Sequence, residues 1–466
     1  MKSTHYWSIL ILITIAAAIL RFWNIGAFNE IVFDEVYFAK YAYNFLTDEF
    51  YFDTHPPLSK YFIAIGIWIH NSLPWISDPA IGTVPIEELS PVSWRWMNAF
   101  IGSVVVIVGA FFAKTMSKNA LFSLIFASFL AVDGTLLVES RFGLNNIYIV
   151  FLGLCSLFFI AKALTDTKHI RRYLLGAGVF LGLTYSVKWN GLAYSLAVWA
   201  TLGSAIVICF LLKKNVLKSV SKGNKQLFLS HALFSKVKVW ELPLYLIAVP
   251  FLIYFLQWQP HLSKFDKYGF KEMQRQILVY HSSTVKKDEH PYCSRWYTWP
   301  IMKRPMGYYF KKTEVKAEDG TSSTLFTDVH LFGNVALFVL GFISIFYLAG
   351  NWLLNAWRWY SGGDVSRGFV LKTFILMGFF GNWLPWMIVS RCLFLYHYVS
   401  AAVFSFTALA WVVSDLIQLR KKWSYAFAGI LLCAVIFSFF YWLPFQLGIT
   451  VPKEVFYERM WFRSWI

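Results

Sequence analysis

Charged residues are scarce in this chain. Only 14% of its 466 residues are Asp, Glu, Lys or Arg, whereas a soluble domain carries about 25%. Hydrophobic residues make up 58% and aromatic residues 20%, which excludes an intrinsically disordered chain. Too few charges remain to cover a water-soluble globule of this length, so the composition predicts a polytopic membrane protein.

Cysteines and familiar cofactor motifs are also sparse. The five cysteines are scattered and mostly lie within apolar segments, which argues against a secreted disulfide scaffold. Histidines and acids show no metal-type spacing such as His-Glu-x-x-His, and no Gly-rich phosphate loop occurs. We therefore expect no obligatory metal or cofactor and no direct use of a nucleotide sugar.

Long apolar runs, in contrast, are abundant. A membrane core of roughly 30 Å needs about 20 mostly apolar helical residues. We predict eleven spans, at 6–24, 95–113, 119–134, 144–163, 171–187, 190–212, 241–257, 329–349, 369–390, 393–416 and 424–442. The first lacks a small-residue cleavage pattern, so we interpret it as a retained helix and not as a cleaved signal peptide.

Basic residues are unevenly distributed among the loops that join these spans. If the N-terminus is cytoplasmic, the inner loops hold seventeen Lys and Arg, whereas the 25–94 loop on the opposite side holds two against nine acids. Because Lys and Arg are retained on the cytoplasmic side, we predict an N-in, C-out orientation. Most of the net charge of +17 then comes from inner loops, where basic residues set the orientation of the chain in the membrane. A nucleic-acid partner is therefore not expected.

Two outer segments, 25–94 and 258–328, are far longer than a connection between helices requires, and such loops usually carry function. The inner loop 213–239 is rich in Lys and Ser and lacks acids; we interpret it as solvated or facing lipid headgroups. No internal repeat divides the chain. We expect a single all-α transmembrane domain over residues 1–466.

Two adjacent acids, Asp34 and Glu35, lie between apolar and aromatic residues just after the first span. Such surroundings can hold a carboxylate partly desolvated, which suits a general base. Asp34 could instead cap a helix running through Val36–Leu46. Both interpretations stay open on the residues alone.

A second polar group, Asp53 and His55, precedes two prolines and the apolar segment 58–69. Prolines fit the first turn of a helix, and this segment is too short to span, so we predict a re-entrant or interfacial helix. Asp53 and His55 could cap that helix or support Asp34 by hydrogen bonding.

Five motifs in order along the chain together resemble the protein O-mannosyltransferase family. They are Phe33-Asp-Glu-Val-Tyr37 followed by Phe52-Asp-Thr-His-Pro-Pro-Leu-Ser-Lys60, Arg95-Trp-Met-Asn-Ala99, Ser186-Val-Lys-Trp-Asn-Gly191, His290-Pro-Tyr-Cys-Ser-Arg295 with Trp299-Pro300, and Arg391-Cys-Leu-Phe-Leu-Tyr-His-Tyr398. The resemblance implies the GT-C membrane fold and transfer of mannose from a polyprenyl- or dolichyl-phosphate-linked donor to Ser/Thr hydroxyls of translocated proteins. It places the site on the extracytoplasmic side of the cell membrane, with the secretion translocon as a candidate partner.

The chain departs from the family pattern at two places. Eukaryotic members carry a large β-trefoil (MIR) insert where 258–328 leaves no room for one, so the chain resembles the shorter bacterial type. Relatives often have an Asp where this chain has Asn146, and the role of that acid cannot be carried over to an uncharged residue.

Four cations at predicted outer span ends would suit the donor phosphate, because a leaving phosphate gains negative charge that Arg and Lys stabilise. They are Arg95, Arg141, Lys188 and Arg391. Each could instead snorkel to the headgroups. His397 could bind the same phosphate or pack inside the bundle.

The aromatic stretch of the second outer loop would suit a sugar ring or an extended peptide. We expect acceptor or sugar contacts from His290, Tyr292, Arg295 and Trp299, and also from Asp53 and His55. An interfacial Trp/Tyr belt is the alternative for the aromatic residues.

The mechanism that follows is inverting transfer with Asp34 as general base and Glu35 as an alternate base or a positioner of the acceptor. Two other functions fit the pattern. One is a related GT-C enzyme that transfers a sugar to lipid A, another lipid or a glycan. The other is a transporter, which should show repeat symmetry and broken helices.

Overall fold

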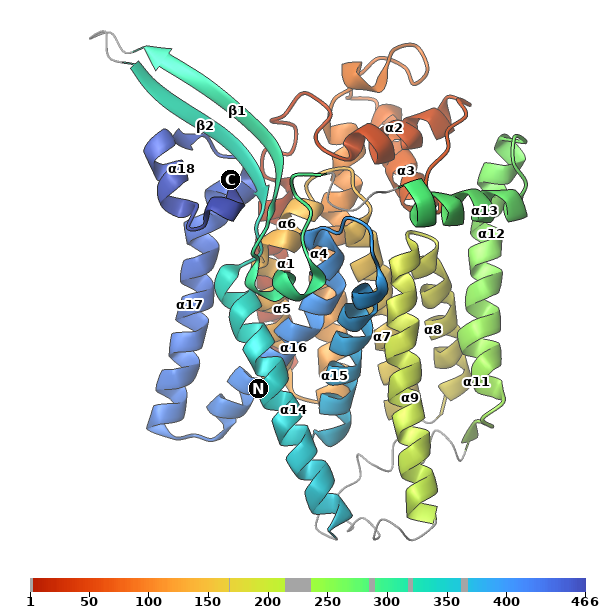
Figure 1. Cartoon of the computed structure of the whole chain (residues 1–466), viewed down its shortest axis with the longest axis vertical. Coiled ribbons are helices and arrows are strands. Elements are labelled where there is room, and N and C mark those ends of the chain that lie inside the picture. The colour runs from red at the N-terminus through yellow and green to blue at the C-terminus, as the bar shows by residue number, and fades with distance from the viewer. Residues whose placement is uncertain (1–2, 167, 214–235, 285–289, 317–321, 362–367) are drawn as a thin grey trace.

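The computed structural model describes residues 3–166, 168–213, 236–284, 290–316, 322–361 and 368–466. Long helices stand side by side as a bundle, and short helices and a β-hairpin gather at one end of it (Figure 1). The two long loops predicted to share one side of the membrane, 25–94 and 258–328, both lie at this end. The inner loop 213–239 falls largely outside the described residues.

All eleven predicted spans contain helix. The bundle consists of α1 (Ser3–Phe22), α4 (Val92–Ser117), α5 (Ala120–Val132), α7 (Asn146–Thr165), α8 (Ile170–Tyr185), α9 (Leu192–Lys213), α11 (Glu241–Pro243) continuing through the π-helical Leu244–Ala248 into α12 (Val249–Lys264), α14 (Val335–Tyr360), α15 (Phe369–Trp383), α16 (Val399–Gln418) and α17 (Lys422–Leu447). Within the described part of the chain, seven helices are long and apolar enough to cross a membrane. The count of eleven spans and their orientation remain predictions.

Small residues let neighbouring helices of the bundle approach closely. Gly178 and Gly182 lie one turn apart on α8, and a Cβ at either position would collide with a backbone carbonyl of the facing helix, at Tyr245 and Pro250. Without a hydrophobic driving force between helices in lipid, such close packing of backbones is a main source of association. This contact fixes α8 against α12.

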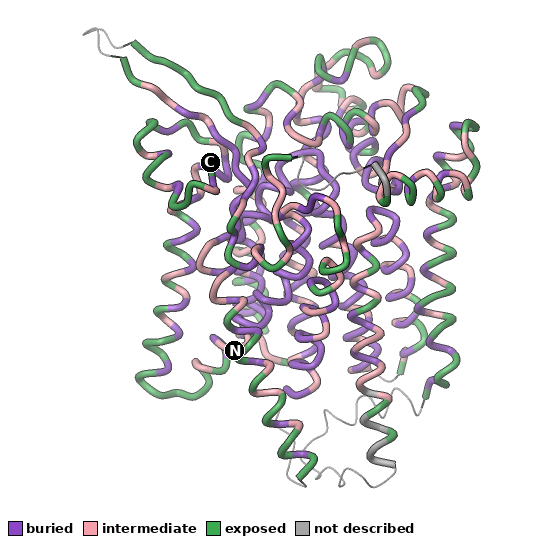
Figure 2. Tube along the Cα trace, viewed as in Figure 1, coloured by how far each residue is buried: buried purple, intermediate pink, exposed green. Residues whose placement is uncertain are grey.

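Buried residues concentrate in the middle of the bundle, and the outward faces of the peripheral helices are exposed (Figure 2). These outward faces are apolar, with exposed side chains such as Leu12 on α1, Phe251 on α12 and Phe437 on α17. An exposed apolar surface of this extent is stable only against lipid. The fold therefore fits the membrane protein predicted from composition.

The loop end of the bundle carries the shorter elements. They are α2 (Glu35–Leu46), α3 (Leu58–Ser72), α6 (Gly134–Glu139), α13 (Phe270–Val279) and α18 (Lys453–Arg459), with single turns at Ile86–Glu88, Trp189–Gly191, Tyr280–Thr284, Trp296–Ile301, Leu384–Ile388, Leu395–Tyr398 and Arg463–Trp465. α2 and α3 correspond to the two helices predicted in the first outer loop, and α3 begins directly after Pro57 as expected.

A small sheet within this end was not predicted from the sequence. β1 (Met306–Lys316) and β2 (Ser322–Leu331) form an antiparallel hairpin that projects beyond the bundle, and β3 (Val451–Pro452) adds to β2 (Figure 1). The register shifts between Gly307 and Tyr309, so Tyr308 is an extra residue in β1. Such a bulge re-aims a side chain. The predicted helical membrane fold is therefore present, with this small sheet added to it.

Candidate active site

The backbone turn before α2 is strained and sets the position of Asp34. Phe33 has a φ of +53°, a left-handed conformation that is unusual for an aromatic residue and occurs often at functional sites. Its ring stacks on that of Tyr308, with centroids 4.1 Å apart and an angle of 10° between the planes. Asp34 occupies the N-cap position of α2, but its side chain makes no capping hydrogen bond. The cap interpretation thus holds for its position but not for its carboxylate.

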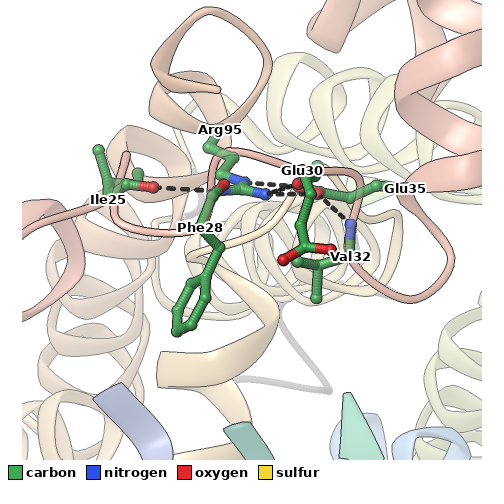
Figure 3. Close-up of polar contacts among 7 residues, drawn as sticks. Ile25, Phe28, Glu30, Val32, Glu35 and Arg95 are labelled. Atoms are coloured by element: carbon green, nitrogen blue, oxygen red, sulfur yellow. Dashed lines mark hydrogen bonds and ion pairs between the residues drawn. The ribbon is translucent and has the colours of Figure 1, made fainter. Parts of the chain in front are cut away.

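The neighbouring Glu35 lies in a fully buried ion pair with Arg95 (Figure 3). Arg95 Nε and Nη2 each donate to one of the two carboxylate oxygens, and both hydrogen bonds measure 2.8 Å. The carboxylate also accepts from the backbone N–H groups of Val32 and Gly143, at 2.9 and 2.8 Å. Four hydrogen bonds therefore hold this side chain, and none of its oxygens is left for an acceptor hydroxyl.

The remaining donors of Arg95 bind backbone carbonyls of the loop before α2. Nη1 donates to Ile25 at 3.3 Å and Phe28 at 2.8 Å, and Nη2 also donates to Glu30 at 2.8 Å. All five N–H donors of a guanidinium are thus used within the protein. The prediction that Arg95 binds the donor phosphate finds no support in this geometry; Arg95 instead shapes the turn that carries Asp34.

Arg141 has a similar structural position. Its Nη1 donates to the carbonyls of Leu20 and Trp23 at the end of α1, at 3.0 and 2.7 Å, and its Nη2 lies 3.5 Å from the carbonyl of Leu447 at the end of α17. The side chain is buried. It joins helix ends through carbonyls that would otherwise lack partners, so its predicted phosphate role is unsupported as well.

Lys188 and Arg391, in contrast, line a cavity of about 480 Å³. The Lys188 ammonium lies over the ring of Tyr396, 4.9 Å from its centroid, and this group has no hydrogen bond or ion pair within the described residues. Within the described part of the chain, the Arg391 guanidinium has a single long hydrogen bond, from Nη1 to the carbonyl of Cys392 at 3.4 Å. Apolar α9 side chains, including Leu192 and Leu196, line the same cavity. Two cations beside an apolar wall match the chemistry of a lipid-linked phosphate.

Asp34 interacts electrostatically with Lys188, one of these two cations. Burial raises the pKa of Asp34 to about 6, while the charge of Lys188 lowers it and that of Asp53 raises it. Burial and the neighbouring Arg391 lower the pKa of Lys188 to about 8, and Asp34 and Glu139 oppose that change. An acid with a pKa just below neutrality is suited to take a proton as general base.

Asp53 and His55 lie beside this cavity in different roles. Asp53 forms a buried ion pair with Lys60 and accepts a hydrogen bond from the His55 backbone N–H at 3.1 Å. The N-cap of α3 is Pro57, without side-chain capping, so of the two alternatives for Asp53 and His55 the capping role is not seen. No hydrogen bond joins Asp34 to either residue in the described chain. The His55 ring lines the cavity and stacks on His281, at 5.6 Å.

The second outer loop is tied to the Arg391 segment. A disulfide joins Cys293 to Cys392, and the Ser294 backbone N–H donates to the Leu393 carbonyl at 2.8 Å. No disulfide is predicted from the scattered cysteines of the sequence. Cys293 and Cys392 meet because the fold brings together positions that are 99 residues apart. The sequence signal for this pair is that both cysteines lie on the predicted outer side, Cys293 in the 258–328 loop and Cys392 in the short turn between the spans 369–390 and 393–416.

The residues of the second outer loop that were predicted to contact the sugar or the acceptor lie partly at the surface and partly in the core. Arg295 lines a recess of about 790 Å³ together with Arg304 and Arg391. His290 is exposed beside Phe394, and the Tyr292 ring lies under the Arg304 guanidinium at 5.0 Å. Trp299 is buried, and its Nε1 donates to Ser294 Oγ at 2.8 Å, so it supports the loop and offers no surface for a sugar.

His397 is likewise part of the supporting wall. It is buried between Trp386, at 4.4 Å, and Trp299, at 6.1 Å, and the Phe394 backbone N–H donates to its Nδ1 at 3.0 Å. It does not line the cavity. Of its two predicted roles, packing inside the bundle is the one that this geometry supports.

No group of three or more His, Cys, Asp or Glu side chains that could hold a metal ion occurs among the residues that the structure describes. Two acids of this region already have cationic partners: Asp53 pairs with Lys60, and Glu35 pairs with Arg95.

Comparison with known families decides the affiliation. Residues 11–265 match the family described as dolichyl-phosphate-mannose-protein mannosyltransferase, and residues 267–465 match the C-terminal four-transmembrane region of protein O-mannosyltransferases. The chain belongs to the protein O-mannosyltransferase family. It is therefore an enzyme of a glycosyltransferase family, which excludes the transporter alternative.

Bacterial mannosyltransferases are similar over nearly the whole chain. The polyprenol-phosphate-mannose–protein mannosyltransferase of Mycolicibacterium smegmatis is 23% identical over 98% of this chain and 93% of its own length. The enzyme of the same name from Corynebacterium glutamicum is 24% identical over 99% of this chain and 93% of its own.

Solved structures show the same fold. The Saccharomyces cerevisiae protein O-mannosyltransferase Pmt1-Pmt2 complex bound to the sugar donor matches with a TM-score of 0.79 and 14% identity, over 100% of this chain and 93% of that chain. ArnT from Cupriavidus metallidurans bound to undecaprenyl phosphate matches with a TM-score of 0.52 and 11% identity, over 92% and 62%. The GT-C fold inferred from the resemblance is thereby confirmed.

Proposed function

We propose that this enzyme transfers mannose from polyprenyl-phosphate mannose to Ser or Thr hydroxyls of proteins emerging from the secretion translocon, at the outer membrane face and with inversion. The observation that carries the proposal is a half-buried Asp34 whose carboxylate has no hydrogen bond within the described chain and which interacts electrostatically with Lys188, a lining residue of the cationic cavity. The names of the relatives, which are polyprenol-phosphate-mannose–protein mannosyltransferases, supply the donor and the acceptor class.

The reaction is a single displacement. Asp34 takes the proton of the acceptor hydroxyl, the oxygen attacks the anomeric carbon, and the bond from that carbon to the phosphate oxygen breaks with its electron pair. Attack from the side opposite the leaving group inverts the configuration. Polyprenyl phosphate leaves as an anion, which needs no protonation, so one general base suffices.

The cavity supplies the complementary charge. Lys188 and Arg391 neutralise the leaving phosphate, and Arg391 can bind it with two parallel hydrogen bonds. The polyprenyl chain would lie along the apolar side of the cavity, where Leu192 and Leu196 on α9 are about half exposed. Glu35 and Arg95 act indirectly, because they hold the loop that carries Asp34.

Several observations support an outer location for the site. The acid-rich 25–94 loop carries few basic residues, and it lies at the same end of the bundle as the 258–328 loop (Figure 1). The Cys293–Cys392 disulfide at this end fits an oxidising compartment. Labelling of a Glu49→Cys variant by a membrane-impermeant maleimide in intact cells tests the orientation; labelling only after lysis would place the loop inside.

The function is tested with membranes, radiolabelled polyprenyl-phosphate mannose and a Ser/Thr-rich peptide. Wild-type membranes should label the peptide, and Asp34→Asn should lower the rate by about 10²- to 10⁴-fold, the usual contribution of a general base. Glu49→Gln, an exposed acid of the same loop, is the matched control and should retain activity. Label that moves only to lipid would favour a related GT-C enzyme with a lipid acceptor, and an active Asp34→Asn would remove Asp34 as base.

A further inference from the structure

Another buried acid, Glu139, lies at the end of α6 and has no part in the mechanism above. It is fully buried. Its Oε1 accepts hydrogen bonds from Asn146 Nδ2 at 3.0 Å and from Tyr308 Oη at 2.7 Å. Its Oε2 is buried without any hydrogen-bond partner in the described chain. Burying a carboxylate oxygen without a hydrogen-bond donor costs free energy. The Glu139 carboxylate can therefore accept a further hydrogen bond from a bound ligand.

The position of Glu139 is linked to that of Asp34 through Tyr308. The Tyr308 hydroxyl donates to Glu139, and the Tyr308 ring stacks on Phe33, the residue directly before Asp34. The bulge in β1 makes this possible, because Tyr308 is the extra residue there. Tyr308 therefore connects three elements, namely the strained turn at Phe33, the hairpin and α6.

The charges around Glu139 show which part of the substrate it would face. Lys188 and Asp34 both act on Glu139: the first favours its charged form and the second disfavours it, while burial raises its pKa to about 7. In an inverting displacement the sugar lies between the incoming oxygen, near Asp34, and the leaving phosphate, near Lys188. A group that interacts with both therefore borders the sugar ring.

We propose that Glu139 is a sugar-binding residue of the reaction centre, whose free Oε2 accepts a hydrogen bond from a hydroxyl of the transferred mannosyl group, while Tyr308 and Asn146 hold its other oxygen. This inference rests on the proposed function. Asn146 serves in this arrangement as a hydrogen-bond donor to Glu139.

The test compares sugar-dependent with sugar-independent binding in the purified full-length enzyme. Glu139→Gln should lower kcat/KM for polyprenyl-phosphate mannose by about 10- to 100-fold, the range for a hydrogen bond to a charged group. Inhibition by polyprenyl phosphate, which has no sugar, should stay within about twofold of wild type, because Lys188 and Arg391 bind the phosphate. Tyr308→Phe keeps the ring stack and should show a smaller loss of the same kind.

Glu241→Gln is the matched control, because Glu241 is a buried acid hydrogen-bonded to Arg171 far from the cavity; it should leave kcat/KM unchanged even if the protein becomes less stable. An unchanged kcat/KM in Glu139→Gln, or an equal loss of polyprenyl phosphate inhibition, would overturn the proposal. A wild-type enzyme that labels no peptide would instead refute the proposed function, so the two failures are distinguishable.

Discussion

Glu35 and Arg95 form a two-pronged ion pair in which both side chains are fully buried and both bonds measure 2.8 Å. This pair connects α2 to α4 across 60 residues of sequence. It lies directly beside Asp34, so the adjacent acids of one motif divide into a structural and a reactive member. Three backbone carbonyls on Arg95 complete the arrangement.

Removing one charge of this pair should destabilise the fold. Glu35→Gln leaves a buried guanidinium uncompensated, which costs about 3–5 kcal/mol, so the detergent-solubilised variant should unfold at a clearly lower temperature. Lys40→Gln breaks the exposed contact with Glu87, where the side chains are 50% and 47% exposed, and should change stability by less than about 1 kcal/mol. Equal stability of Glu35→Gln and wild type would contradict the structural role.

The plot of kcat/KM for the donor against pH should be bell-shaped. Because the pKa of Asp34 is raised to about 6, the base is lost by protonation as the pH falls through 6. Because the pKa of Lys188 is lowered to about 8, the phosphate-binding charge is lost as the pH rises through 8. The profile of kcat/KM for the donor, measured from pH 5 to 10, should therefore peak near neutrality.

Lys188→Arg separates the two limbs of this bell. Arginine stays charged throughout this range, so the alkaline limb should move upward while the acidic limb stays near pH 6. An alkaline limb that does not move would assign it to another group. At saturating donor, the bound phosphate should also shift the alkaline limb of kcat to higher pH, since it favours the charged lysine.

Two arginines that looked alike in the sequence should respond differently to substitution. Arg391→Ala should raise KM for the donor by about 10- to 100-fold through loss of a charge-assisted contact, with little change in unfolding temperature. Arg141→Lys removes contacts with helix-end carbonyls and should cost about 1–3 kcal/mol of stability, with an unchanged KM in the folded fraction. The reverse pattern would exchange their roles.

The disulfide should matter for donor binding. Cys392 follows Arg391 directly, and Cys293 ties it to the second outer loop, so a Cys293→Ser/Cys392→Ser variant should bind the donor several-fold more weakly. Loss of a cross-link that closes a loop of this length should also lower stability by about 4–5 kcal/mol in the chain-entropy view. Cys433→Ser, at a free cysteine, is the control. Wild-type KM in the double variant would show that the cross-link does not position Arg391.

The membrane class, the long apolar helices and the family resemblance follow from the amino-acid pattern alone. These features are local, because apolar runs, Pro-Pro before α3 and motif order are properties of neighbouring residues. The hairpin escaped prediction: its projecting half is largely exposed, so little of the buried alternation typical of a strand occurs.

Which charged side chains are held by partners and which are free depends on contacts between distant segments. Glu35, Arg95 and Arg141 look as reactive in the sequence as Asp34, Lys188 and Arg391, yet the first three are held by partners from distant segments. Glu139 and Tyr308 meet across 169 residues. A side chain's chemistry depends on its hydrogen-bond partners and on its desolvation, and both are set by contacts between segments whose separation along the chain carries no trace of their meeting.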